Sequence, residues 1–226
     1  MFNKLKNLFA APVDAAPESI ASPREARLAA MIEELGEPDH ILLDDDKDFP
    51  VDIYAFGRDF GDCDDDDDHD EGYVLVTNGM SDKLMRRPVT SNESDSDADE
   101  SLAVELIWYV REVTPDYVHY LRWLAKLPQI DETWFGSGHT VPMPEAPLNG
   151  CAFKTFFFMT PISETDKYLL SEFQNGEHEI EMLTVNLISP AEYTLVKTND
   201  GLNQFFDLLD EKNYPLIHDP ARVSFV

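Results

Sequence analysis

The chain has 226 residues and a hydrophobic content of 43%, which is enough to bury a sizeable core. It carries 45 acidic residues against 17 basic ones, a formal charge of −28 at pH 7. Nucleic acids and anionic membranes are bound through basic surfaces, so this balance argues against both and favours a basic protein partner.

Cysteine use and hydropathy bear on the compartment. Cys63 lies in an acidic tract and Cys151 follows Asn149-Gly150, so the two do not resemble a disulfide framework. No stretch reaches 18 consecutive apolar residues, so no membrane span is predicted. Together these features predict a reducing, cytoplasmic setting.

The N-terminal region predicts a leader followed by a helix. Residues 1–22 are expected to be a flexible leader, because Ala, Pro and Ser dominate its second half. An alternative for its start is a short helix in weak contact with a membrane or a partner. A helix is predicted over residues 23–35, since Ser22 and Glu25 form a capping box around Pro23.

A β-rich region follows. Alternating or β-branched residues predict strands over residues 51–56, 73–77 and 102–110. Asn78-Gly79 directly after the second strand indicates a turn. The polar stretch between the second and third strands, with an acidic part at residues 91–100, is predicted to be a long loop.

The second half alternates helices and strands. A helix begins at the Thr114 cap and is expected to end at Pro128. An irregular segment rich in Gly and Pro comes next. Further elements are predicted as strands over residues 151–159 and 181–188, helices over residues 190–196 and 201–209, and an extended tail. This order predicts an α/β (α+β) fold, a mixed and mainly antiparallel sheet packed with helices, in a single domain spanning residues 23–226.

The tract at residues 62–71 places eight carboxylates around Cys63 and His69. A calcium loop starting at Asp67 would need a bidentate Glu at its twelfth position, where Asn78 stands. A zinc site would have only two good ligands. Consecutive aspartates repel one another, so a hydrated loop is expected, with a weak divalent-cation site or a docking surface for a basic partner as alternatives. No metal site and no cofactor is predicted.

Motifs of catalysis are missing from the sequence. The six histidines form neither H-E-x-x-H nor another ligand pair, and there is no G-x-S-x-G, Walker A or G-x-G-x-x-G motif. Cys151 is expected to be a small buried residue. His139, next to Gly138, is open to a ligand or a peptide, or else is held by hydrogen bonds of its own loop. The chain is therefore not predicted to be an enzyme.

Several segments, in order, carry a family resemblance. NGMSD at residues 78–82 follows an apolar strand, and LAVELIWYV holds Glu105 inside another one. YLRWLAKLPQIDETWFGSGHTVP spans residues 120–142, FKTFFFMTP and VNLISPAEYTLVKTNDGLNQFFDLL follow, and HDPAR stands near the end. Over roughly residues 25–224 the chain resembles bacterial members of the Suppressor of fused domain family.

The resemblance also has departures. The two acidic tracts are not part of the family pattern, which favours their interpretation as hydrated loop insertions. The animal protein has a second domain that finds no counterpart here, so its two-domain clamp on a peptide is not expected.

The resemblance implies a non-enzymatic domain that binds a protein or peptide. Bacterial members look like immunity proteins of toxin systems, and an acidic protein suits a basic toxin. A regulatory adaptor of another partner is the alternative, and a metal-dependent hydrolase is a further one. The sequence does not specify the oligomeric state.

Five residues of the family segments are expected to bind the partner: Asn78, Ser81, Asp82, Trp134 and His139. The alternative is that they only brace their two loops. Glu105 lies inside an apolar strand, so it must be either exposed or paired.

Overall fold

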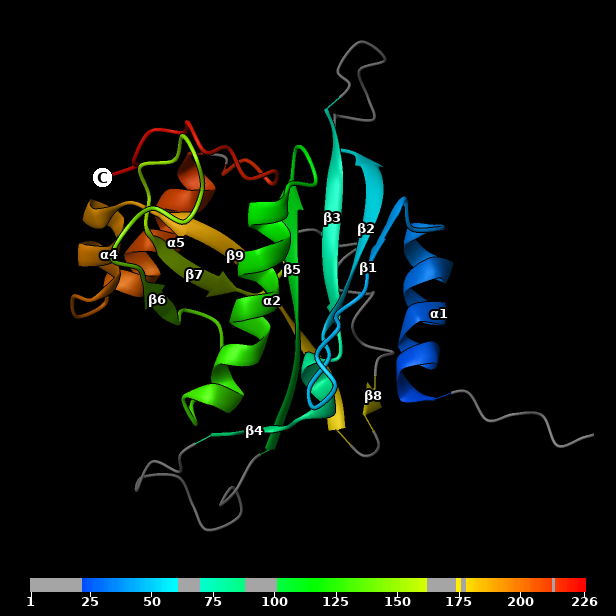
Figure 1. Cartoon of the computed structure of the whole chain (residues 1–226). Coiled ribbons are helices and arrows are strands. Elements are labelled where there is room, and N and C mark those ends of the chain that lie inside the picture. Colours follow the sequence, from blue (N-terminus) through cyan, green and yellow to red (C-terminus); the bar gives the residue numbers. More distant parts are fainter. Residues whose placement is uncertain (1–21, 61–69, 88–100, 162–173, 176–177, 213) are drawn as a thin grey trace, which may run out of the picture.

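The computed structural model describes residues 22–60, 70–87, 101–161, 174–175, 178–212 and 214–226 (Figure 1). The expected leader up to residue 21, residues 62–69 of the first acidic tract and all of the second lie outside the described residues. Of the first tract, Asp70 and Glu71 are described, and Glu71 begins a strand.

The described elements are strands, helices and one 3₁₀ turn. The strands are β1 (His40–Leu42), β2 (Asp52–Asp59), β3 (Glu71–Asn78), β4 (Met85–Arg86), β5 (Ser101–Val110), β6 (Thr140–Pro142), β7 (Thr155–Met159), β8 (Gln174–Asn175) and β9 (His178–Ile188). The helices are α1 (Pro23–Leu35), α2 (Pro115–Ile130), α4 (Pro190–Val196) and α5 (Gly201–Glu211), and the 3₁₀ turn η1 is Met80–Asp82.

All of the described strands belong to one sheet. Its main order is β1-β2-β3-β5-β9-β7-β6, with β4 paired to β5 and β8 paired to β9. β5 and β9 run parallel, and the other named pairs are antiparallel. The predicted mixed, mainly antiparallel sheet is confirmed.

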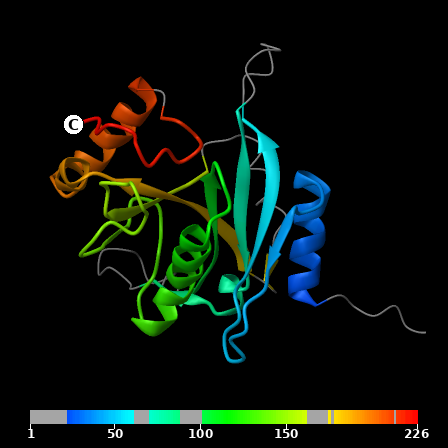
Figure 2. The ribbon, with the colours of Figure 1, turned by 45° about the horizontal axis from the view of Figure 1, so that its top comes forward.

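Helices cover both faces of the sheet (Figures 1 and 2). α2 packs on one face over a core that includes Trp108, and α1 packs on the other face over a core that includes Ile107. α4 and α5 close a third cluster around Phe157. Because β5 is central, its alternate residues enter the cores of opposite faces, which explains why residues 102–110 are apolar on both sides apart from Glu105.

The helix starts follow local signals. Ser22 and Glu25 form the predicted capping box of α1, and Ser189 and Glu192 form a second capping box at the start of α4. α2 does not end at Pro128 as predicted but continues to Ile130. Pro128 lacks an N–H group, but the Leu127 carbonyl still accepts a hydrogen bond from the Asp131 N–H at 2.9 Å, so the last turn closes beyond the proline.

The strand boundaries differ more from the predictions. β7 begins at Thr155 rather than at Cys151, because Cys151 closes a turn with an N–H bond to the Leu148 carbonyl at 3.2 Å. β9 begins three residues earlier than predicted. β1, β4, β6 and β8 were not predicted, since strands of two or three residues are too short to show an alternating pattern.

Candidate functional site

The NGMSD segment folds around the side chain of Glu105, which comes from the neighbouring strand β5. This side chain is fully buried. One carboxylate oxygen accepts bonds from Gly79 N (2.8 Å), Ser81 N (3.1 Å) and Ser81 Oγ (2.6 Å). The other accepts from Thr77 Oγ1 (2.6 Å) and Met80 N (3.3 Å). Consecutive backbone N–H groups of the turn thus form an anion-binding nest, and the anion is a side chain of the same chain.

The turn has room for glycine alone at its second position. Gly79 has φ +139°. A Cβ atom there would lie 2.6 Å from a guanidinium nitrogen of Arg24 and 2.7 Å from the Pro50 carbonyl oxygen. Glycine at position 79 is therefore required by this backbone geometry and by the close approach of Arg24 and Pro50.

Two arginines of α1 fasten this turn. Arg27 is 2% exposed, and it donates to Asn78 Oδ1 at 2.8 Å and to Asp82 Oδ1 at 2.5 Å. Its Nε lies 3.9 Å from a carboxylate oxygen of Glu105. Arg24 donates to the second Asp82 oxygen at 2.5 Å. We call this set the NGMSD cluster: Arg24, Arg27, Thr77, Asn78, Gly79, Met80, Ser81, Asp82 and Glu105.

Three of the five expected partner-binding residues belong to this cluster. Asn78 and Ser81 are 1% and 0% exposed, so their side chains face the interior. Asp82 is partly exposed, but both of its oxygens are held by the arginines of α1. These three residues brace the turn, and only Asp82 is accessible to a partner. Of the two expectations for Glu105, pairing is correct.

Trp134 and His139 form a second group, on the loop between α2 and β6. Their ring centroids are 4.2 Å apart, and His139 Nδ1 lies 3.2 Å from the Trp134 carbonyl oxygen. Burial lowers the pKa of His139, and the contact with the Trp134 carbonyl opposes that shift. The Arg87 guanidinium lies 5.7 Å from the Trp134 ring centroid. His139 is therefore held by contacts within its own loop and is partly exposed.

The two groups do not form one site. The NGMSD cluster follows β3, whereas His139 directly precedes β6 at the margin of the sheet. Four strand positions separate β3 from β6, roughly 19 Å at the usual spacing between strands.

A buried ion pair near the C-terminus was not predicted. Glu192 is fully buried, and Arg222 donates to its two oxygens at 2.7 and 2.8 Å. The rings of Phe153, Tyr214 and Phe225 surround the guanidinium at 4.4, 5.4 and 4.7 Å. Burial opposes ionisation of Glu192, but the hydrogen bonds from Arg222 and from backbone N–H groups outweigh it and lower its pKa. Arg222 ends the HDPAR segment, which could have indicated this pair, but the sequence predicted only an extended tail there.

His218 of the same tail is buried beside this ion pair. It is 3% exposed, and its ring lies 6.0 Å from Trp108 and 6.2 Å from Tyr117, measured between ring centroids. Its backbone N–H donates to the Tyr109 carbonyl at 2.9 Å. Burial lowers the pKa of His218 to about 4, the charge of Arg222 lowers it further, and nearby Asp219 opposes them.

This histidine predicts a loss of stability in acid. Folding favours neutral His218, so its stabilising effect is complete above the unfolded pKa of about 6.5 and is lost as pH falls toward 4. The expected loss is about 3 kcal/mol in the free energy of unfolding by pH 4. Urea unfolding at several pH values would measure it. His218→Phe should flatten this part of the curve, and an equal acid loss in that variant would contradict the assignment.

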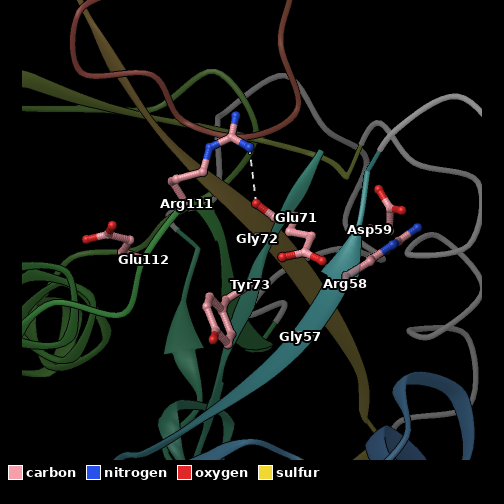
Figure 3. Close-up of a pocket in the computed structure, with 8 residues that line it drawn as sticks. All are labelled: Gly57, Arg58, Asp59, Glu71, Gly72, Tyr73, Arg111 and Glu112. Carbon is pink, nitrogen blue, oxygen red and sulfur yellow. Dashed lines mark hydrogen bonds between the residues drawn. The ribbon is translucent and has the colours of Figure 1, made fainter. Parts of the chain in front are cut away.

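A cavity of about 750 Å³ opens where β2 meets β3 (Figure 3). Its lining is Gly57, Arg58, Asp59, Glu71, Gly72, Tyr73, Arg111 and Glu112. Arg111 forms an ion pair with Asp70 and donates to the Glu71 carbonyl at 3.1 Å. Because its lining holds both arginines and carboxylates, this cavity favours neither an anion nor a cation.

Other chemistry can be tested against the described part of the chain. There, no group of three His, Cys, Asp or Glu residues is placed to hold a metal ion. Cys151 is 7% exposed, and burial raises the pKa of its thiol, as expected for a structural cysteine. None of the described helices is long and apolar enough to cross a bilayer.

The family model for Suppressor of fused protein matches residues 47–223, well over half of the chain. No curated protein matches the chain. A solved Suppressor of fused homologue from Neisseria gonorrhoeae FA 1090 is similar, with 15% identity, a TM-score of 0.64 and coverage of 90% of this chain and 96% of that one.

Two further solved structures share the fold. Drosophila Suppressor of Fused has 10% identity and a TM-score of 0.59 over 88% of this chain, which spans only 50% of that protein. The structure of a Sufu–Fu complex has 9% identity and a TM-score of 0.59, covering 88% of this chain and 89% of that one. The family model and the shared fold agree, and this chain belongs to the Suppressor of fused family.

Proposed function

We propose that residues 23–226 form a non-enzymatic domain that binds a basic protein. The observation that carries the proposal is that the side chains of the family signature bond to one another inside the protein. Glu105, Asn78 and Ser81 are buried and bonded within the NGMSD cluster, so the signature maintains a scaffold rather than exposing reactive groups. A scaffold of this kind leaves binding to the outer surface.

The charge and a structural relative support a basic protein partner. An excess of 28 negative charges speeds association with a cationic protein and disfavours anionic ones. A relative with the same fold was solved in a Sufu–Fu complex, which is a precedent for protein binding by this fold. We propose immunity to a basic toxin in the cytoplasm as the natural setting, with Asp82 and the half-buried Trp134 and His139 as the candidates for contact.

Affinity capture from the native host tests this function. The full chain should retain one basic protein at low salt and lose it as the salt rises, since exposed charge pairs are screened. Trp134→Ala/His139→Ala should retain less of that protein, and the exposed His119→Ala is the matched control. Mass spectrometry of the eluates measures both.

Growth assays separate the immunity role from an adaptor role. The captured protein should arrest growth when expressed alone, and co-expression of this chain should restore growth. A captured protein that is harmless would favour the regulatory adaptor. The absence of any salt-sensitive partner would contradict the proposed function.

A further inference from the structure

The edge strand β1 and the residue after it carry two exposed apolar side chains. β1 ends the strand order, and Figure 1 shows it beside α1. Ile41 is 57% exposed and Leu43 is 68% exposed. Residues two apart on an extended chain point to the same side, so these side chains share one face, while Leu42 turns the other way and packs on the α2 core.

That face is the one that α1 covers elsewhere. Ile41 is paired in register with Tyr54 of β2, and Tyr54 packs in the core beneath α1. α1 covers Tyr54 but leaves Ile41 and Leu43 open to solvent. Because Ile41 and Leu43 lie exposed beside the covered Tyr54, a second molecule can pack against them and extend this apolar surface.

Carboxylates flank this apolar pair along the chain. The segment from residue 33 to residue 48 contains one lysine and eight acids: Glu33, Glu34, Glu37, Asp39, Asp44, Asp45, Asp46 and Asp48. Lys126 neutralises two of them, Asp44 and Asp46, at 2.7 Å each. Glu37 and Asp45, which flank β1 on either side, are exposed.

The charges decide which occupant fits. A second copy of this chain would place the same carboxylates against one another, which costs free energy. A partner with Lys or Arg beside apolar side chains would instead complement both features. The backbone contributes less, because the Leu42 carbonyl already accepts a bond from Arg122 at 2.6 Å.

We propose that the β1 surface, defined as Glu37, Ile41, Leu43 and Asp45, docks a basic partner. The partner's apolar side chains cover Ile41 and Leu43, while its cationic side chains meet Glu37 and Asp45. The inference depends on the proposed function for the existence of a natural partner, but the surface can be tested without that partner.

Two labelled peptides test the surface on the full chain. One is a short peptide of alternating lysine and leucine, and the other has serine in place of each leucine. At physiological ionic strength the leucine peptide should bind the native chain about tenfold more tightly, because it adds apolar contact to the same charge. Fluorescence anisotropy measures both affinities.

Substitutions locate the contact. Ile41→Ser/Leu43→Ser should abolish the advantage of the leucine peptide, whereas Ile130→Ser/Val226→Ser, which removes two exposed apolar side chains elsewhere, should leave it intact. Equal affinities of the two peptides for the native chain, or an advantage that persists in the β1 variant, would overturn the proposal. Thermal melts confirm that the variants are folded.

A charge comparison completes the test. Glu37→Gln/Asp45→Asn should weaken both peptides more than Asp207→Asn/Asp210→Asn, which removes the same charge from α5. Equal weakening by the two pairs would overturn the electrostatic part of the proposal. Failure here, with a natural partner still captured, would reject the β1 surface and leave the proposed function standing. Success here without any captured partner would support the β1 surface and reject the proposed function.

Discussion

Glu105→Gln should lower the free energy of unfolding by about 3 to 5 kcal/mol, the usual cost of breaking a buried charged network. Five donor groups converge on the native carboxylate, two of them as the backbone N–H groups of Gly79 and Ser81 on one oxygen. A glutamine amide fills the same volume but accepts through one oxygen only, so some donors would be left buried and unpaired. Urea unfolding followed by tryptophan fluorescence measures the change.

Two controls show whether this loss comes from the nest. Ser81→Ala removes one bond to Glu105 and should cost about 1 to 3 kcal/mol, the usual range for a hydrogen bond to a charged group. The exposed Glu112→Gln should have almost no effect. A Glu105→Gln protein as stable as the native chain would show that the turn does not need the negative charge.

Arg222→Met should cost a similar amount, about 3 to 5 kcal/mol, because it leaves the Glu192 carboxylate buried without its cation. The guanidinium also packs against three aromatic rings, so a methionine keeps part of the volume while the charge is lost. Arg222→Lys should fail to restore the native stability, since lysine cannot bind both oxygens in the same fork geometry. Denaturant unfolding of the three proteins measures these differences.

The double variant Arg222→Met/Glu192→Leu distinguishes loss of the pair from loss of packing. It removes both charges, so it should be more stable than Arg222→Met alone. A double variant less stable than Arg222→Met would show that the aromatic surroundings, rather than the uncompensated charge, set the cost.

The NGMSD cluster shows the limit of sequence interpretation. The strand, the Asn78-Gly79 turn and the importance of Glu105 could all be predicted, because each depends on a local pattern or a family segment. The sequence could not predict whether these side chains point into the protein or toward solvent. Ser81 and Glu105 are 24 residues apart, and Arg27 and Asn78 are 51 apart. The pairing of β3 with β5 brings Ser81 to Glu105, and the packing of α1 against the sheet brings Arg27 to Asn78.

Taken alone, the sequence determined the family, the mixed and mainly antiparallel fold and the starts of α1 and α4, because caps, turns and alternation act within a few residues. The tertiary structure decided the pairing of Glu192 with Arg222, the burial of His218 and the exposure of Ile41 and Leu43. Those outcomes depend on which distant segments cover a residue. Burial and ion pairing are properties of a packed surface, and a one-dimensional pattern specifies them only where the partner lies nearby in the chain.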